Sequence, residues 1–128
     1  MVLLRKALFV LGTSFLVLIS SLVQEGVSSA SPSSTIEPCA YAQGLTCTRT
    51  IASVNMRAQP NTESSIIINI ASGTVVALGC WAGGESINGD NIWYEVERDE
   101  DYPVGPMGFV SGYWLDTGKD PLQSLRAC

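Results

Sequence analysis

The chain has 128 residues, carries a net charge of −5 at neutral pH and contains no histidine. The missing histidine excludes Ser-His-Asp and Cys-His catalytic sites, in which an imidazole takes the proton from the nucleophile. The acidic balance also argues against a basic surface that would bind nucleic acid or anionic membranes. The length allows one ordinary domain after an N-terminal segment is set aside.

Residues 1–30 have the features of a secretory signal peptide. Arg5 and Lys6 give a positive start, and residues 7–19 form an uncharged, mostly apolar run. Small residues occupy the −3 and −1 positions of a cleavage site after Ala30. We therefore expect cleavage there and a secreted product without membrane contact. An uncleaved anchor is the alternative, but the uncharged run is at the lower length limit for crossing a bilayer.

Residues 31–49 are predicted to be a linker followed by a disulfide-bearing segment. The four cysteines are Cys39, Cys47, Cys80 and Cys128, and an even number in an exported chain indicates two disulfides. Three pairings are possible. We favour Cys39–Cys47, within one short segment, and Cys80–Cys128, which ties the last residue to a central strand. A zinc site is disfavoured because no C-x2-C pair is present and zinc needs reduced thiols, so we expect no metal and no cofactor.

Short apolar runs separated by glycine, proline and asparagine predict an all-β domain over residues 50–128. In the first run, Val54 and Met56 fall on one face, and Asn55 and Arg57 fall on the other. The expected strands are 52–57, 66–70, 74–81, 92–98 and 107–111, with a helical turn over 112–115.

The turns between these runs predict how the strands connect. Residues 66–81 are expected to form a hairpin, and residues 82–91 and 99–106 are expected to be polar loops. Five or six short strands with such turns predict a small antiparallel barrel, with a short helical turn near the C-terminus. Closure would remove the exposed edges that a flat sheet leaves.

An ordered set of motifs over residues 50–116 resembles bacterial SH3 (SH3b) domains. The motifs are Val54-Asn55-Met56-Arg57, Pro60, Gly73-Thr74, Trp93-Tyr94-Glu95-Val96, Gly108-Phe109-Val110, Tyr113 and Leu115. The sequence has Ala58-Gln59 where the family usually has Ser-Gly, and Phe109 where it often has Trp. The resemblance implies an SH3-like barrel.

The resemblance also implies binding rather than catalysis. SH3b modules generally attach secreted proteins or cell-wall hydrolases to peptidoglycan, often through its peptides. Secreted, single-domain members have cysteines in the positions of Cys80 and Cys128, which supports the favoured pairing. We therefore expect a secreted, non-catalytic module that binds peptidoglycan or its peptides. The alternatives are a secreted protein–protein interaction domain, such as an inhibitor or effector, and a stable domain that has lost its binding role.

The side chains expected to contact a ligand are Arg57, Trp81, Trp93, Tyr102, Tyr113 and Trp114. Arg57 suits the carboxylates of wall peptides, and its alternative role is a surface salt bridge to residues 99–101 or to Asp116. An exposed cluster of Trp81, Trp93, Tyr102 and Trp114 would suit sugar rings or peptides. Alternatively, these rings cover the ends of the barrel and the disulfide. Tyr94 and Phe109 are expected in the core.

Overall fold

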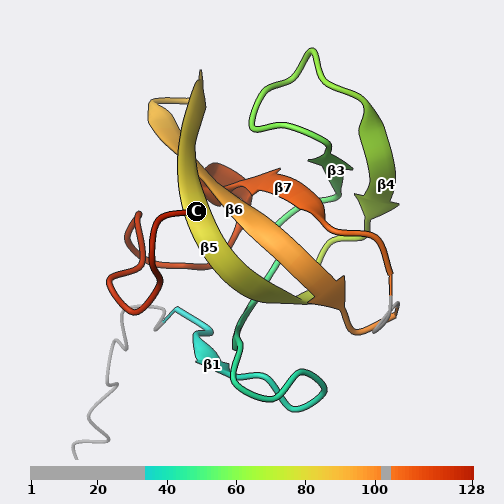
Figure 1. Cartoon of the computed structure of the whole chain (residues 1–128), viewed down its shortest axis with the longest axis vertical. Coiled ribbons are helices and arrows are strands. Elements are labelled where there is room, and N and C mark those ends of the chain that lie inside the picture. The colour runs from blue at the N-terminus through green and yellow to red at the C-terminus, as the bar shows by residue number, and fades with distance from the viewer. Residues whose placement is uncertain (1–33, 102–104) are drawn as a thin grey trace, which may run out of the picture.

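The computed structural model describes residues 34–101 and 105–128, so the expected signal peptide and Tyr102 lie outside the described residues. The regular secondary structure of the described chain is almost entirely β-strand (Figure 1). Its strands are β1 (Glu37–Pro38), β2 (Thr46–Arg49), β3 (Val54–Arg57), β4 (Ile66–Ile70), β5 (Val75–Ile87), β6 (Asp90–Asp99) and β7 (Gly108–Ser111), and a 3-10 helix, η1 (Gly112–Trp114), follows β7. Within these ranges no helix has the length and apolar character needed to cross a membrane.

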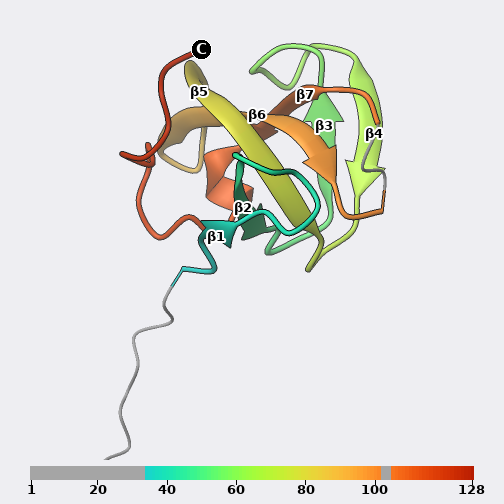
Figure 2. The same ribbon diagram turned by 60° about the horizontal axis from the view of Figure 1, so that its bottom comes forward.

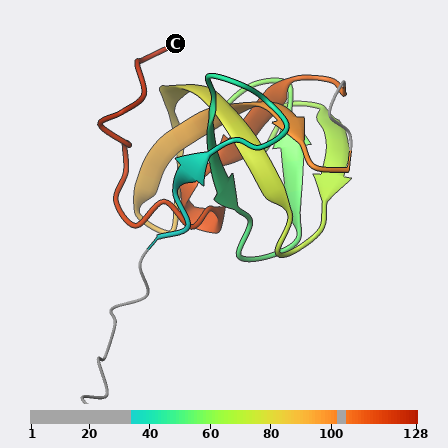
Figure 3. The same ribbon diagram turned by 90° about the horizontal axis from the view of Figure 1, so that it is seen from below.

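The strands form one antiparallel sheet in the order β1-β2-β5-β6-β7-β3-β4. The long strand β5 runs obliquely across the molecule beside β6 (Figure 1 and Figure 2). Seen from below, the strands bend around a common interior (Figure 3). The all-β antiparallel class and the helical turn are therefore confirmed. The prediction that the sheet closes into a barrel is wrong, because the edge strands β1 and β4 do not pair with each other in the described chain.

The hairpin expected over residues 66–81 does not form, because β4 pairs with β3 while β5 pairs with β2 and β6. Thr50 redirects the chain between β4 and β5. Its Oγ1 donates to the Ala71 carbonyl (2.7 Å) and accepts from the Thr74 N–H (3.1 Å). Its backbone carbonyl accepts from the Gly73 N–H (2.8 Å). Since Thr50 satisfies these turn groups, β5 can cross to the far side of the sheet.

The polar loop expected over residues 82–91 is instead the end of a long hairpin. Strand β5 runs to Ile87 and β6 begins at Asp90. The two residues between them, Asn88 and Gly89, have φ angles of 49° and 91°. Positive φ at both positions gives the type I′ turn that Asn-Gly favours. The predicted loop is wrong, although the Asn-Gly pair carried the signal for a two-residue turn.

The main core lies between β3, β5, β6 and β7. Its buried members are Val54, Met56, Ile70, Val76, Leu78, Tyr94, Val96, Val110 and Leu115. Each fully buried aliphatic side chain contributes about 1.5–3 kcal/mol. The alternation predicted for the first strand is confirmed, since Asn55 and Arg57 are only half buried. Tyr94 is in the core as expected, whereas Phe109 is partly exposed.

Both favoured disulfides are present. The Cys39–Cys47 bond belongs to a second, small apolar cluster under β1 and β2, with Val75 from β5. Strand β2 also pairs with β5, so residues 46–49 of the expected N-terminal segment are part of the sheet. The Cys80–Cys128 bond fixes the last residue to β5, and a bond that closes so long a loop stabilises by about 4 kcal/mol in the chain-entropy account.

Tyr94 also holds the C-terminal tail. Its hydroxyl donates to Asp120 Oδ1 (2.5 Å) and accepts from the Leu122 N–H (2.8 Å). Burial, followed by the hydrogen bond to Asp120, raises the pKa of the Tyr94 hydroxyl well above its usual range. The hydroxyl therefore remains a proton donor throughout the working pH range, and the tail stays attached to the core.

A second carboxyl lies beside Asp120 where the tail meets the start of β6. Asp90 accepts a hydrogen bond from the Ile92 N–H (2.9 Å). Partial burial, followed by the hydrogen bond to Asp120, raises the pKa of Asp90 from 3.8 to about 6. The folded state therefore binds a proton more tightly than the unfolded state. The contribution of protonated Asp90 to the free energy of unfolding is fully present below the pKa of the unfolded state, 3.8. It is lost as the pH rises through the folded-state pKa of about 6.

The end of the β5–β6 hairpin, called the hairpin arm here (residues 83–91), folds back over β6. The Glu85 N–H donates to the Pro60 carbonyl (3.0 Å), and Trp93 Nε1 donates to the Glu85 carbonyl (2.8 Å). Gly84 lies at this contact. A Cβ there would overlap the Pro60 carbonyl oxygen and lie 2.9 Å from Trp93 Cδ1. Only glycine permits so close an approach.

We predict that Gly84→Ala destabilises the protein and that Gly83→Ala does not. A methyl group at position 84 must displace Pro60 or Trp93, and overpacking of this kind costs about 1–3 kcal/mol. A Cβ at Gly83 meets nothing within 4 Å, so its free energy of unfolding should change by less than about 0.5 kcal/mol. Urea unfolding measures both values, and equal stability of the two variants would contradict the close packing of the arm.

We predict that Asp90→Asn raises the melting temperature near neutral pH and that the gain shrinks as the pH is lowered toward about 4. Asparagine keeps an acceptor for the Ile92 N–H but has no charge to bury beside Asp120. Thermal unfolding between about pH 4 and pH 8 measures the effect, with Glu63→Gln as the control for an exposed carboxyl. If Asp90→Asn keeps the wild-type loss of stability over this interval, Asp90 is not the titrating group.

Candidate functional site

A groove with a volume of about 190 Å³ lies between the hairpin arm, β3 and η1. Its lining includes Asn55, Arg57, Thr62, Ile87, Trp93 and Trp114. The structure therefore brings together three of the predicted ligand contacts, which come from β3, β6 and η1. Among the described residues that line the groove, Arg57 is the only one with a charged side chain.

Trp93 forms the base of the groove and is only 2% exposed. Its position opposite Ser111 places it on the same face of the sheet as Glu95, as the alternation predicts. The hairpin arm covers this face, and the indole Nε1 donates to the Glu85 carbonyl (2.8 Å). Trp93 therefore shapes the groove and offers a ligand little surface, unlike a member of the exposed aromatic cluster expected from the sequence.

Trp114 forms the groove wall at η1 and is half buried. Tyr113 packs against it in a T-shaped arrangement, with ring centroids 4.7 Å apart. Ser111 caps η1 by accepting a hydrogen bond from the Tyr113 N–H (3.3 Å), which orders the backbone turn that carries both rings. Tyr113 is 39% exposed and is not part of the groove lining. Of these two predicted contacts, Trp114 alone lies in the groove.

Arg57 lies at the end of β3, and its Nη1 donates to the Ser64 carbonyl (2.9 Å). The loop that carries this carbonyl is well ordered by hydrogen bonds. Asn61 Oδ1 accepts from the Ser64 N–H (2.8 Å), and Ser64 Oγ donates to the Gln59 carbonyl (3.0 Å). The guanidinium is therefore held in place by a fixed acceptor.

The surface salt bridge considered for Arg57 does not form. Within residues 34–101 and 105–128, its guanidinium makes the hydrogen bond to Ser64 and no ion pair. Asp116 instead accepts two hydrogen bonds from Thr35, through the backbone N–H (3.2 Å) and Oγ1 (3.0 Å).

Glu85 and Thr62 join the two walls of the groove. The Glu85 carboxylate accepts from the Thr62 N–H (2.5 Å) and from Thr62 Oγ1 (2.9 Å). These hydrogen bonds, with a smaller effect from the positive charge of Arg57, lower the pKa of the fully exposed Glu85 carboxyl. Sequence reasoning missed both residues, because their contact depends on the fold of the hairpin arm.

Of the two remaining aromatic candidates, Trp81 is not among the described residues that line the groove. Trp81 pairs with Tyr94, so it lies on the opposite face of the sheet from Trp93 and packs against the main core. Tyr102 lies outside the described residues. Of the aromatic cluster expected from the sequence, Trp93 and Trp114 are the members that come together.

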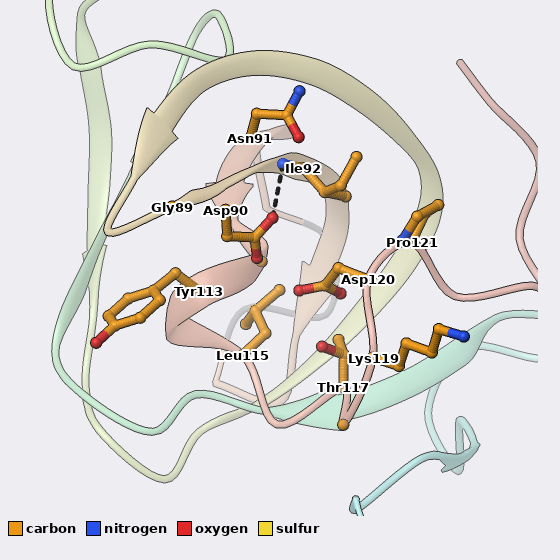
Figure 4. Close-up of a pocket in the computed structure, with 12 residues that line it drawn as sticks. Gly89, Asp90, Asn91, Ile92, Tyr113, Leu115, Thr117, Lys119, Asp120 and Pro121 are labelled. Atoms are coloured by element: carbon orange, nitrogen blue, oxygen red, sulfur yellow. Dashed lines mark hydrogen bonds between the residues drawn. The ribbon is translucent and has the colours of Figure 1, made fainter.

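A wider, open hollow of about 600 Å³ lies between the β5–β6 turn, η1 and the tail (Figure 4). The carboxyl groups of Asp90 and Asp120 face each other in it, while the side chains of Tyr113 and Lys119 point away. No local pattern in the sequence joins these two distant carboxyls. Asp120 binds the Tyr94 hydroxyl, so the pair belongs to the attachment of the tail.

Three potential metal ligands lie close together near the C-terminus. Donor atoms of Cys80, Glu95 and Cys128 all lie within 4.8 Å of one another. Both sulfur atoms are joined in a disulfide, so neither is the thiolate that zinc requires.

The two disulfides of the described chain indicate a compartment outside the cytoplasm.

Comparison with known proteins adds an independent finding. Residues 52–116 match the family described as bacterial SH3 domain. Two proteins of Bacillus subtilis (strain 168) are similar to this chain. "Uncharacterized protein YraJ" is 36% identical over 73 residues, which cover 54% of this chain and 62% of that protein. "Uncharacterized protein YraI" is 37% identical over 73 residues, which cover 54% and 61%.

The chain thus spans about three fifths of the length of these relatives. No solved structure matches it. The family match covers about half of the chain and includes every groove residue named above. The chain belongs to the bacterial SH3 domain family.

Proposed function

We propose that this protein is an exported, non-catalytic binding module whose groove binds the peptides of cell-wall peptidoglycan. The proposal rests on the composition of the groove. Its described lining combines an apolar base, polar side chains on β3 and the positive charge of Arg57. Such a site holds the side chains of a short peptide and hydrogen-bonds its backbone. Membership of the bacterial SH3 domain family supports binding as the general role.

The two serine hydroxyl groups of the groove support a non-catalytic role. Ser53 Oγ donates to Asn69 Oδ1 (2.9 Å), and Ser111 Oγ accepts from the Tyr113 N–H (3.3 Å). A serine nucleophile needs a neighbouring general base, and the sequence contains no histidine. Both hydroxyls organise the fold instead.

The size of the groove supports a peptide as the ligand. Its volume of about 190 Å³ is smaller than that of a pocket for a drug-sized molecule. A few residues of an extended peptide fit between the hairpin arm and β3, whereas a glycan chain needs a longer surface. The signal-peptide features of residues 1–30 and the two disulfides support export.

A second candidate function is an interaction with another secreted protein. Strand β4 is an edge of the sheet and consists almost entirely of isoleucine, with Ile66 54% exposed. Met107, which precedes β7, is 59% exposed. An open apolar edge is a template for a strand from a partner.

We predict that the purified, disulfide-bonded protein co-sediments with peptidoglycan sacculi and that Asn55→Phe lowers the bound fraction at least about fivefold, or about 1 kcal/mol. The new ring would occupy the groove. Asn69→Phe is the matched control, because Asn69 Nδ2 donates to Asn55 Oδ1 (3.0 Å). Both variants lose that hydrogen bond, and Asn69→Phe also removes the acceptor of the Ser53 hydroxyl, but of the two positions only 55 lines the groove.

Thermal unfolding first establishes that both variants are folded. Equal loss of sedimentation in both would contradict the groove as the binding site. A folded wild-type protein that stays in the supernatant with several wall types would refute wall binding and favour the protein partner.

A further inference from the structure

We infer that the groove recognises the free carboxylate of a peptide C-terminus, with Arg57 as its anchor. This inference rests on the proposed function and deepens it, because it assigns the groove to peptide ends that are not cross-linked. In a chain with a net charge of −5, the one charged side chain among the described residues that line the groove is positive. The groove is therefore complementary to an anionic group at one position.

Arg57 has hydrogen-bond donors to spare. A guanidinium carries five N–H donors in a rigid fork, and Nη1 uses one of them on the Ser64 carbonyl. Within the described ranges this side chain makes no ion pair, although it is half buried. Its remaining donors match the two oxygens of a carboxylate, which arginine binds through two parallel hydrogen bonds.

The position of this guanidinium is fixed before a ligand arrives. The Ser64 carbonyl belongs to the loop that Asn61 and Gln59 hold through their hydrogen bonds to Ser64. A side chain held in this way loses little conformational freedom on binding, so more of the interaction energy contributes to affinity.

The positive charge of Arg57 contributes to the lowered pKa of Glu85, but the two side chains do not form an ion pair. The two oxygens of Glu85 are occupied by the N–H and the hydroxyl of Thr62. A ligand carboxylate at Arg57 would therefore meet a free guanidinium and a nearby negative charge. Removal of that charge should favour an anionic ligand and leave a neutral one unaffected.

The rest of the groove fits a terminal residue with a small side chain. Trp114 gives an apolar wall over the buried Trp93, and Asn55 provides an amide beside Arg57 on the same strand. The limited volume leaves space for the last one or two residues of a peptide rather than a cross-linked junction.

The test compares N-acetyl-D-alanyl-D-alanine with its C-terminal amide by NMR titration of the disulfide-bonded protein. The free acid should bind at least about tenfold more tightly, since charge-assisted hydrogen bonds are stronger than neutral ones. Arg57→Gln should reduce the affinity for the acid to that for the amide. Arg49→Gln is the matched control, because Arg49 Nη1 also donates to one backbone carbonyl, that of Gly73 (3.0 Å), outside the groove.

Glu85→Gln should strengthen binding of the acid about two- to threefold and leave the amide unchanged. Glutamine keeps an oxygen acceptor for the Thr62 N–H, and its amide N–H can donate to Thr62 Oγ1, so the contact between the two walls is retained. If Arg57→Gln does not fold, Arg57→Lys and Glu85→Gln still test the charge at this site. Arg57→Lys should retain a reduced preference for the acid.

Equal binding of acid and amide would overturn the inference and leave wall binding intact. The inference would also be overturned if glycerol phosphate bound as tightly as the free acid, because the groove would then accept any anion. Binding of neither peptide, with sedimentation on sacculi retained, would assign the groove to another part of the wall polymer. Failure of both assays would overturn the proposed function itself.

Discussion

The contact of the hairpin arm with Pro60 at Gly84 is the constraint on which the groove depends. Because position 84 has no side chain, the next residue can hydrogen-bond to the Pro60 carbonyl and cover Trp93. The same approach allows Glu85 to reach Thr62 and thereby join the two walls. One backbone contact thus buries the base of the groove and sets its width.

This arrangement makes stability and binding inseparable at Trp93. Truncation of a buried tryptophan costs about 3–5 kcal/mol, a large share of the stability of a small domain. Loss of binding in such a variant would follow from collapse of the groove and would not identify a contact. Side chains on the rim, such as Asn55 and Arg57, can be changed without a cavity, so they are the positions that separate the two effects.

Local patterns in the sequence predicted the strands from β3 onward, apart from the end of β5, and the core tyrosine, because these follow from alternation. The short β1 and β2 were missed. The pairing of the cysteines was one of three possibilities, favoured by their positions and supported by the resemblance to secreted bacterial SH3 domains. The order of the strands could not be predicted from local patterns. Strands β4 and β5 do not pair as a hairpin, because Thr50 forms hydrogen bonds to the turn between them, which lies more than twenty positions later in the sequence. The burial of Trp93 was missed for a similar reason. Strand alternation placed it on an outer face, and only the folded hairpin arm covers that face.

Charge limits how this protein could bind the cell-wall peptides that are proposed as its ligand. Its net negative charge provides no long-range attraction to an anionic polymer, and repulsion between them is screened beyond about 10 Å at moderate salt. Recognition must therefore come from contacts made after close approach. Arg57 suits this requirement, because a half-buried guanidinium on a fixed carbonyl acts over a short range and is screened less than an exposed lysine. In such a protein, one well-placed cation gives selectivity for a particular group, whereas a basic patch would give general affinity for the whole surface.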